Sequence, residues 1–188
     1  MHTVLLIIDI QNDYFPGGAM ELVGADSAST QAALLLTAFR ERAMPVVHIQ
    51  HISTRPTATF FRQNTHGVEI HSSVFPKPGE IVIVKNYPNC FRETSLLEVL
   101  RAAEITKLVV VGMMSHMCVD TTIRAASDLG FTCTLAHDAC ATRDLTFRDQ
   151  TVPASAVQAA YMAAIDGSFG DVIATKDVYD NLPILKEI

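Results

Sequence analysis

Apolar residues along the chain gather in six short runs that predict β-strands. Each run is rich in Val, Ile or Leu at successive positions, so both faces of the strand would be apolar. Such strands are typical of a parallel sheet that is covered by helices on both sides. The runs are "TVLLIID" from Thr3, "PVVHIQH" from Pro45, "EIVIVK" from Glu80, "KLVVVG" from Lys107, "FTCTLAHD" from Phe131 and "DVIAT" from Asp171.

Between most of these runs the apolar positions follow a helical period. Pro153 suits the first turn of one such helix, and Gly130 stands where another would end in a left-handed cap. The predicted helices cover residues 28–42, 94–103, the stretch after Cys118 and 153–165. Because strands and helices alternate over 188 residues, the sequence predicts one α/β domain, residues 1–188, with three layers.

Two stretches depart from this alternation. Residues 52–79 contain Pro, Thr, Gly and His without a helical period, and residues 139–152 follow the fifth strand as a second irregular stretch. Connections as long as the first are usually lids or binding loops, or else disordered. The adjacent Phe60 and Phe61 favour an ordered, partly apolar loop.

Composition and charge exclude several classes of partner. The chain is 49% hydrophobic and 18% charged, which is typical of a folded protein, and no apolar run approaches the roughly 20 residues of a membrane span. Its 14 Lys and Arg against 20 Asp and Glu, without a basic run, argue against nucleic acid. The start of the chain lacks the basic segment of a secretion signal, so we expect a cytoplasmic location. Four cysteines without a CxxC pair are expected to be free thiols.

Three reactive side chains follow the ends of different predicted strands. Asp9 ends the first run, Lys85 ends the third, and Cys118 comes shortly after the fourth. In open parallel sheets the ligand crevice lies beyond the carboxyl ends of the strands, so these residues should converge. Cys118 would lie in the first turn of a helix, where free N–H groups and the helix dipole favour a thiolate. This pattern predicts a catalytic site.

Each of these residues also has a simpler interpretation. Asp9 could cap the turn that follows it, and Lys85 could be a solvated lysine at the rim of the sheet. Cys118 could be an inert buried thiol, which is the commonest fate of a free cysteine. The coincidence of all three at one edge favours the catalytic interpretation.

The segments around these residues resemble the isochorismatase-like cysteine hydrolases. The resemblance is carried by "DIQNDY", "VKNYPNCFRETSL" and "VGMMSHMCVDTTIRAASDLGF" followed by "DA", and it extends from Val4 to the last strand. It implies a six-stranded parallel sheet and a catalytic triad of Asp9, Lys85 and Cys118. It also implies a non-proline cis peptide before Met114, an oxyanion hole formed by the N–H groups of Met114 and Cys118, no cofactor, and a homodimer or homotetramer.

The implied reaction is hydrolysis of a C–N bond in a small amide. Asp9 takes the thiol proton, Cys118 attacks the carbonyl, and water cleaves the resulting thioester. A single oxyanion donor can contribute roughly 3 kcal/mol to lowering the barrier. The segment after residue 51 resembles amidase-type members, among them streptothricin hydrolases, but it does not identify the substrate.

Metal-dependent family members, the nicotinamidases, carry a "DxH" after the second strand. Here the corresponding segment, "VVHIQHISTRP", lacks the aspartate, so no metal site is predicted although four histidines lie in the region: His48, His51, His66 and His71. We expect His48 and His51 to belong to the strand end, one pointing inward and one at the rim. Activity should therefore be insensitive to a chelator.

Aromatic residues near the motif ends are the predicted substrate contacts. They are Phe15, Phe61, Tyr87 and Phe91, with His116 and Met117 at the floor of the pocket. For Phe91, packing in the core is an equally good interpretation. For Phe61, the prediction requires the long loop to fold over the site.

Other functions stay open. A nucleotide-binding module of the same layout would need a GxGxxG or phosphate loop after the first strand, where the chain has "DIQNDYFPGG". Two alternatives cannot be distinguished from an amidase by motifs alone. They are an isochorismatase-type hydrolase of another small substrate and a catalytically silent binding protein of the same fold. Thiol labelling distinguishes the latter, because an activated Cys118 should react faster than Cys90, Cys133 and Cys140.

Overall fold

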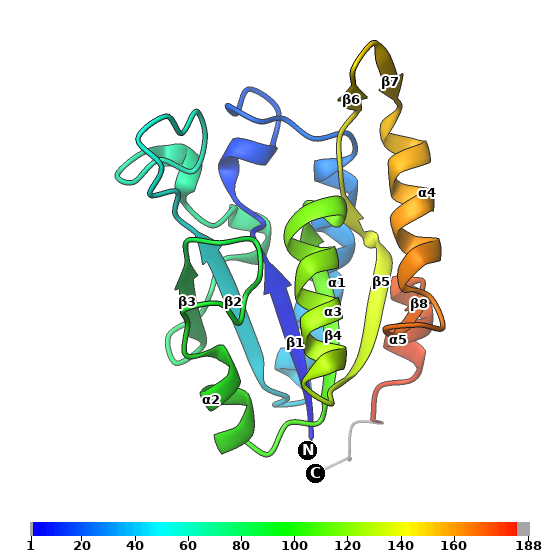
Figure 1. Cartoon of the computed structure of the whole chain (residues 1–188). Coiled ribbons are helices and arrows are strands. Elements are labelled where there is room, and N and C mark those ends of the chain that lie inside the picture. The colour runs from blue at the N-terminus through cyan, green and yellow to red at the C-terminus, as the bar shows by residue number, and fades with distance from the viewer. Residues whose placement is uncertain (1, 184–188) are drawn as a thin grey trace.

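The six apolar runs form one parallel sheet in the computed structural model, which describes residues 2–183 (Figure 1). Its strand order is β3-β2-β1-β4-β5-β8. The strands are β1 (Thr3–Ile8), β2 (Val46–His51), β3 (Ile81–Lys85), β4 (Lys107–Met113), β5 (Thr132–Ala141) and β8 (Asp171–Ile173). The predicted six-stranded parallel sheet is therefore confirmed.

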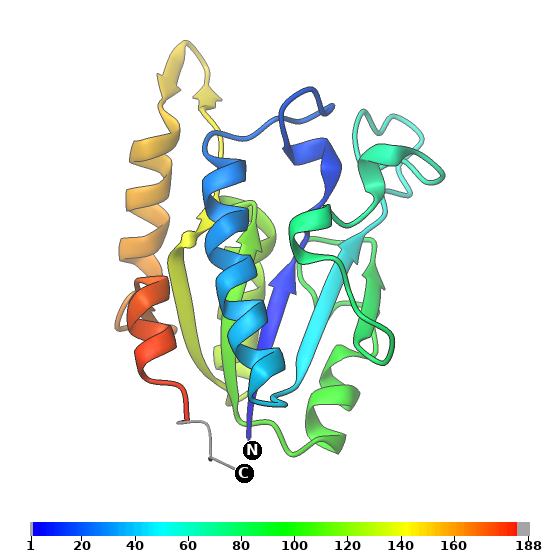
Figure 2. The ribbon, with the colours of Figure 1, turned by 180° about the vertical axis from the view of Figure 1, so that it is seen from behind.

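Helices cover both faces of this sheet, as a three-layer fold requires (Figures 1 and 2). Helices α1 (Ala25–Glu41) and α5 (Thr175–Asp180) lie on one face, and α2 (Leu96–Ala102), α3 (Asp120–Asp128) and α4 (Ala154–Ile165) lie on the other. The sequence predicted four of them. It missed α5 because six residues with two buried side chains, Thr175 and Val178, are too few to display a helical period.

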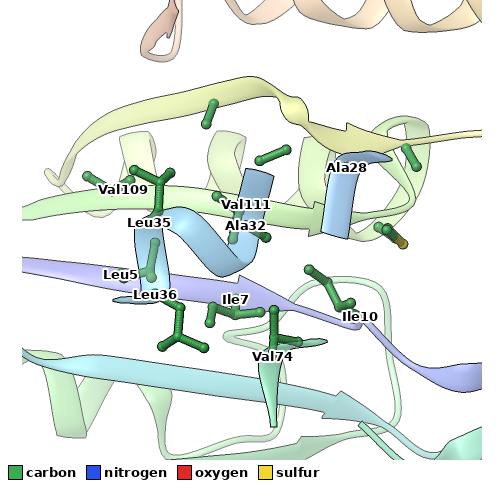
Figure 3. Close-up of a cluster of buried hydrophobic side chains, with 14 of the residues drawn as sticks. Leu5, Ile7, Ile10, Ala28, Ala32, Leu35, Leu36, Val74, Val109 and Val111 are labelled. Carbon is green, nitrogen blue, oxygen red and sulfur yellow. The ribbon is translucent and has the colours of Figure 1, made fainter. Parts of the chain in front are cut away.

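Alternate residues of the central strands fill two separate cores. Leu5 and Ile7 of β1 point toward Leu35 and Leu36 of α1, as Figure 3 shows, and each is at most 2% exposed. Leu6, the residue between them on the strand, packs in the cluster on the opposite face. This alternation explains why the strand sequences are apolar at every position.

The two stretches without helical periodicity are both ordered. Residues 52–79 contain the 3₁₀ turns His66–Val68 and Ser72–Val74. The prediction that 139–152 is irregular was wrong in part, because β5 continues to Ala141 and a hairpin of β6 (Leu145–Phe147) and β7 (Gln150–Val152) follows. This hairpin extends from the body of the fold (Figure 1), so its strands lack the apolar face by which a strand is predicted.

The strand order reverses between β1 and β4, and this reversal opens the crevice in which parallel sheets bind ligands. Gly112 lies inside β4 at this point. A Cβ atom there would lie 2.1 Å from the carbonyl oxygen of Ile8, so glycine is needed for close approach to β1 rather than for a turn after the strand. No helix within residues 2–183 is long and apolar enough to cross a membrane.

Candidate active site

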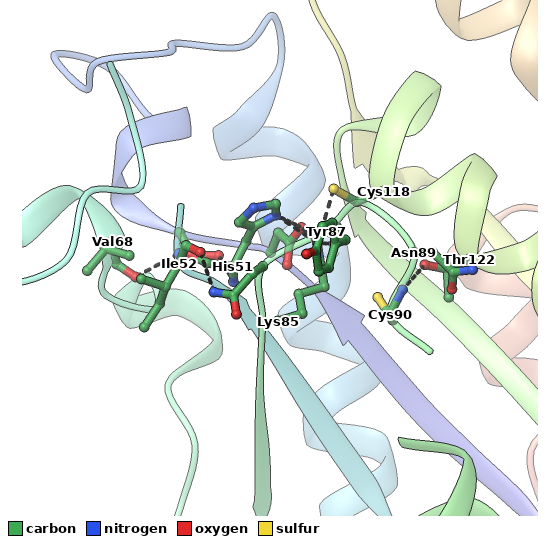
Figure 4. Close-up of polar contacts among 12 residues, drawn as sticks. His51, Ile52, Val68, Lys85, Tyr87, Asn89, Cys90, Cys118 and Thr122 are labelled. Atoms are coloured by element: carbon green, nitrogen blue, oxygen red, sulfur yellow. Dashed lines mark hydrogen bonds and ion pairs between the residues drawn. The ribbon is translucent and has the colours of Figure 1, made fainter. Parts of the chain in front are cut away.

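The three residues predicted at strand ends lie together at the carboxyl edge of the sheet. Asp9 follows β1, Lys85 ends β3, and Cys118 lies in a π-helical turn, Ser115–Val119, which connects β4 to α3. Nζ of Lys85 is 2.7 Å from Oδ2 of Asp9 and 3.2 Å from Sγ of Cys118 (Figure 4). The ammonium group therefore bridges the carboxylate and the sulfur.

Lys85 is not the solvated rim lysine of the simpler interpretation, since it is only 1% exposed. Nζ also donates to the carbonyl oxygen of Tyr87 at 3.1 Å and lies 2.9 Å from Nδ1 of His51. A buried ammonium is stable only when it is paired and hydrogen-bonded, and this one has four polar neighbours for its three hydrogens. The site thus holds a fixed positive charge beside the sulfur of Cys118.

Asp9 is completely buried and does not cap the turn after β1 with its side chain. Its Oδ2 forms the ion pair with Lys85, and apart from this pair neither carboxylate oxygen has a hydrogen-bond partner among residues 2–183. An ionised carboxylate accepts hydrogen bonds through both oxygens, so Oδ1 has acceptor sites that no residue occupies. Asp9 can therefore take a proton from a group that enters the site.

The charges in the site fix the resting protonation of its members. Burial by itself lowers the pKa of Lys85, but the Asp9 carboxylate that faces it raises that pKa above its usual value, and a thiolate at Cys118 would raise it further. Burial and the Asp9 carboxylate raise the pKa of Cys118 well above its ordinary value, and Lys85 offsets this only in part. The resting site therefore holds an ammonium and a neutral thiol. This is opposite to the thiolate that the helix position alone favours.

His51 is a fourth member of the site that was not among the predicted catalytic residues. Burial lowers its pKa to about 4, so the ring is neutral at pH 7. Because an ammonium can only donate, Nδ1 must accept from Lys85, which leaves the ring proton on Nε2. Gln11 fixes the backbone here, since its Oε1 accepts from the His51 amide and its Nε2 donates to the His51 carbonyl.

The two histidines of β2 have the predicted orientations. His48 points inward and is 1% exposed, with Nε2 3.0 Å from Oε2 of Glu80, whereas His51 lies at the rim. The place of His51 beside Lys85 could have been inferred from the strand register, because the two residues pair directly in the ladder between β2 and β3. Each is the last residue of its strand, so both side chains lie at the carboxyl edge of the sheet.

Asp9, His51 and Cys118 offer ligand atoms that all lie within 4.8 Å of one another. Nζ of Lys85 is within 3.2 Å of a polar atom of each of them and already supplies a positive charge. A divalent cation at this place would be repelled by the ammonium, so the donor set does not favour a metal.

The peptide bond between Met113 and Met114 is cis, at the position that the resemblance implied. Met114 and Cys118, whose amides are the expected oxyanion donors, both line one cavity.

This cavity has a volume of about 240 Å³. It lies below the roughly 300 Å³ at which pockets for drug-sized ligands begin, so it suits a small molecule. Its walls contain aromatic, sulfur and hydroxyl side chains. The lining residues are Tyr14, His51, Ser53, Arg55, Thr57, Ala58, Thr59, Phe60, Phe61, Asn86, Pro88, Met114, Met117 and Cys118.

Of the predicted aromatic contacts, Phe61 lies in the cavity wall and Phe15 does not. The 3₁₀ turn Asn12–Tyr14 brings Tyr14 to the cavity instead, and Phe15 stacks on the ring of His71 with 3.6 Å between centroids. The π-helical turn likewise brings Met117, but not His116, to the wall. Nδ1 of His116 is 2.6 Å from Oγ1 of Thr142.

Tyr87 and Phe91 also lie outside the cavity wall. Tyr87 contributes its carbonyl to Lys85, while its ring lies beneath the guanidinium of Arg92 at 3.7 Å. Phe91 stacks on Phe131 with 6.1 Å between centroids, which is the core packing that the sequence left open. Neither ring contacts the space beside Cys118.

Comparisons with known proteins agree with this geometry. The family model described as Isochorismatase domain matches residues 3–177. The isochorismatase family protein YddQ of Bacillus subtilis (strain 168) is 49% identical over 176 residues, which are 94% of this chain and 98% of the relative. A crystal structure of an isochorismatase-type hydrolase from Oleispira antarctica has a TM-score of 0.93 and 46% identity, and covers 96% of this chain and 97% of that one.

Other relatives are named for the molecules they hydrolyse. A streptothricin hydrolase of Streptomyces noursei is 37% identical over 154 residues, which are 80% of this chain and 55% of the relative. The nicotinamidase of Escherichia coli (strain K12) is 27% identical over 174 residues, with 72% and 81% of the two chains covered.

Proposed function

Because this chain belongs to the isochorismatase family of hydrolases, we propose that it cleaves the C–N bond of a small amide through a thioester on Cys118. One observation carries the proposal. The ammonium of Lys85 lies between the Asp9 carboxylate and the Cys118 sulfur, at 2.7 and 3.2 Å, beside a cavity that both Cys118 and Met114 line.

The first half of the reaction begins from the neutral thiol. Since the raised pKa keeps the proton on Cys118 at neutral pH, the proton passes to Asp9 as the sulfur attacks the carbonyl carbon. The S–C bond forms, and the carbonyl π electrons move to the oxygen. The amides of Met114 and Cys118 donate to this oxyanion, and Lys85 keeps its proton throughout.

The second half restores the enzyme. Protonated Asp9 gives its proton to the leaving nitrogen as the C–N bond breaks, and an amine or ammonia departs. Water then attacks the thioester and loses a proton to Asp9, and Cys118 leaves with that proton as the acid product is released. One carboxylate serves as base and acid in turn, which explains why its Oδ1 should be free of other donors.

The names of two relatives support an amide substrate. A nicotinamidase acts on nicotinamide, and a ureidoacrylate amidohydrolase of Caulobacter segnis is named for the same kind of reaction. The small cavity agrees with substrates of that size.

A panel of small primary amides, followed by ammonia release, tests the proposal. The native protein should release ammonia from at least one amide, and Cys118→Ala should not. Cys133→Ala is the matched control, because it removes a buried thiol that lies outside the cavity. Equal release by the native protein and Cys118→Ala would overturn the proposal. A chelator should leave the rate unchanged, because Lys85 supplies the charge.

A further inference from the structure

Within residues 2–183, Arg55 is the one Lys or Arg that lines the cavity beside Cys118, and no Asp or Glu of this part of the chain lines it. We propose that Arg55 binds an anionic group of the substrate, so that the amide cleaved at Cys118 also carries a carboxylate. This inference rests on the proposed amidase function and adds the chemical class of the substrate.

The guanidinium of Arg55 is free to bind an anion. Within residues 2–183 it forms no ion pair, whereas Arg40 and Arg124 are paired with Glu80 and Asp120 at 2.7 and 2.9 Å. Guanidinium groups recognise carboxylates through two parallel hydrogen bonds. An exposed arginine without a partner at the wall of a cavity is therefore suited to a carboxylate that enters the cavity.

The backbone that carries Arg55 is held firmly at the site. The amide of Ala58 donates to the carbonyl of Arg55 at 3.0 Å, which closes a turn with Pro56 at its second position. On either side, the amide of Ile52 donates to the carbonyl of Lys85 at 2.9 Å, and the amide of Ser53 donates to the carbonyl of Phe61 at 2.8 Å. The start of the loop is thus attached to the strand that carries the triad lysine.

Arg55 also gives the cavity its net charge. The negative charge of Asp9 and the positive charge of Lys85 cancel at 2.7 Å, and the thiol of Cys118 is neutral. Arg55 lines the same cavity as His51 and Cys118. Burial is the main cause of the lowered pKa of His51, and the charges of Lys85 and Arg55 contribute in the same direction. An anionic substrate would be attracted to such a cavity and a cationic one repelled.

The other residues of the cavity wall indicate what the rest of the substrate is like. Phe60, Phe61 and Met117 provide apolar contacts, and the volume of about 240 Å³ suits a small molecule. The substrate class is therefore a small monoamide with an apolar body and a carboxylate at the end remote from the amide.

Alkylation of Cys118 by iodoacetate and by iodoacetamide tests the inference without a known substrate. Both reagents transfer a two-carbon group to the sulfur with loss of iodide, and they differ mainly in charge. The rate at the peptide that contains Cys118 is followed by mass spectrometry, and the ratio of the iodoacetate rate to the iodoacetamide rate is compared between variants.

Arg55→Gln should lower this ratio by about two- to fivefold, the factor of an exposed ion pair, and Arg55→Glu should lower it further. Arg62→Gln, an exposed cation of the same loop that does not line the cavity, should leave the ratio unchanged. The same ratio in Arg55→Gln as in the native protein would overturn the inference, and so would an equal fall in Arg62→Gln.

Amide kinetics separate this inference from the proposed function. For an amide with a carboxylate, Arg55→Gln should raise KM with little change in kcat, and for a neutral amide of the same length it should change neither. If amides are hydrolysed at Cys118 with no such difference, the inference alone fails. If Cys118→Ala still hydrolyses them, the proposed function fails whatever the alkylation ratio is.

Discussion

Nζ of Lys85 lies 2.7 Å from Oδ2 of Asp9, and both side chains are completely shielded from solvent. A buried pair of this kind is strongly coupled, because removing one partner leaves an uncompensated charge in a medium of low dielectric constant. The pair therefore contributes to the stability of the site. After burial, which is the main cause, its charges also affect the pKa of Cys118 beside it.

Lys85→Met should lower the free energy of unfolding by about 3–5 kcal/mol, the usual consequence of breaking a buried ion pair. Urea denaturation near pH 7 measures this change. Lys107→Met is the control, because Lys107 is an exposed lysine at the opposite end of a strand, and it should change stability by less than about 0.5 kcal/mol. Equal losses of stability in the two variants would contradict a strong interaction between Lys85 and Asp9.

Asp9→Asn should have opposite effects on two reactions of Cys118. Amide hydrolysis should fall by about 10²- to 10⁴-fold, because the base is lost. Alkylation by neutral iodoacetamide at pH 7 should become faster, because the carboxylate that raises the pKa of Cys118 is gone while Lys85 remains. Asp26→Asn, an exposed carboxylate, is the control. Slower alkylation in Asp9→Asn would show that Asp9 stabilises the thiolate instead.

His51 should make stability depend on pH below neutrality. Burial lowers its folded-state pKa to about 4, so the unfolded chain, with a pKa of about 6.5, binds more protons between these values. Stability should therefore be lost as the pH falls from about 6.5 to about 4. His48, His71 and His116, whose pKa values are also lowered by burial, add to this slope with the same sign.

His51→Gln, which keeps an acceptor for Lys85, should reduce the slope by up to one proton, about 1.4 kcal/mol per pH unit. Denaturation curves across this range for the variant and the native protein measure the difference. Thr30→Gln alters an exposed residue without changing a titratable group and should keep the native slope. An unchanged slope in His51→Gln would mean that the ring is protonated in the folded state.

Gly112→Ala should be more destabilising than Gly79→Ala. Both glycines have positive φ, 136° and 92°, so both substitutions strain the backbone, but an added Cβ meets the Ile8 carbonyl oxygen only at Gly112. The extra loss should be at least about 1–3 kcal/mol, the range for overpacking a core. Thermal and urea unfolding of the two variants test this, and equal losses would exclude the close approach of β4 to β1 as the reason for glycine.

The fold and the convergence of Asp9, Lys85 and Cys118 could be predicted because both depend on patterns that are local in sequence. Strands apolar on both faces indicate a covered parallel sheet, and the residue after each strand lies at its carboxyl edge whatever the loops do. Asp9, Lys85 and Cys118 were found in this way. His51 follows the same rule as the last residue of β2, but its contact with Lys85 has no separate signal in the sequence.

The cavity wall could not be predicted to the same degree. A shift of one residue in a short turn reverses which side chain faces the site, and this is why Tyr14 and Met117 line the cavity while Phe15 and His116 do not. Arg55 lies in a loop whose course is set by backbone hydrogen bonds to β3 and to Phe61, and these have no signature in sequence. The hairpin of β6 and β7 was missed because its strands are exposed.

The thioester on Cys118 is the central claim, and mass spectrometry of the protein quenched during turnover of an amide tests it most directly. The native protein should gain the mass of the acyl group on the peptide that contains Cys118, while Cys118→Ala gains nothing and releases no ammonia. Ammonia release by Cys118→Ala at the native rate, or an acyl group on another residue, would contradict the account.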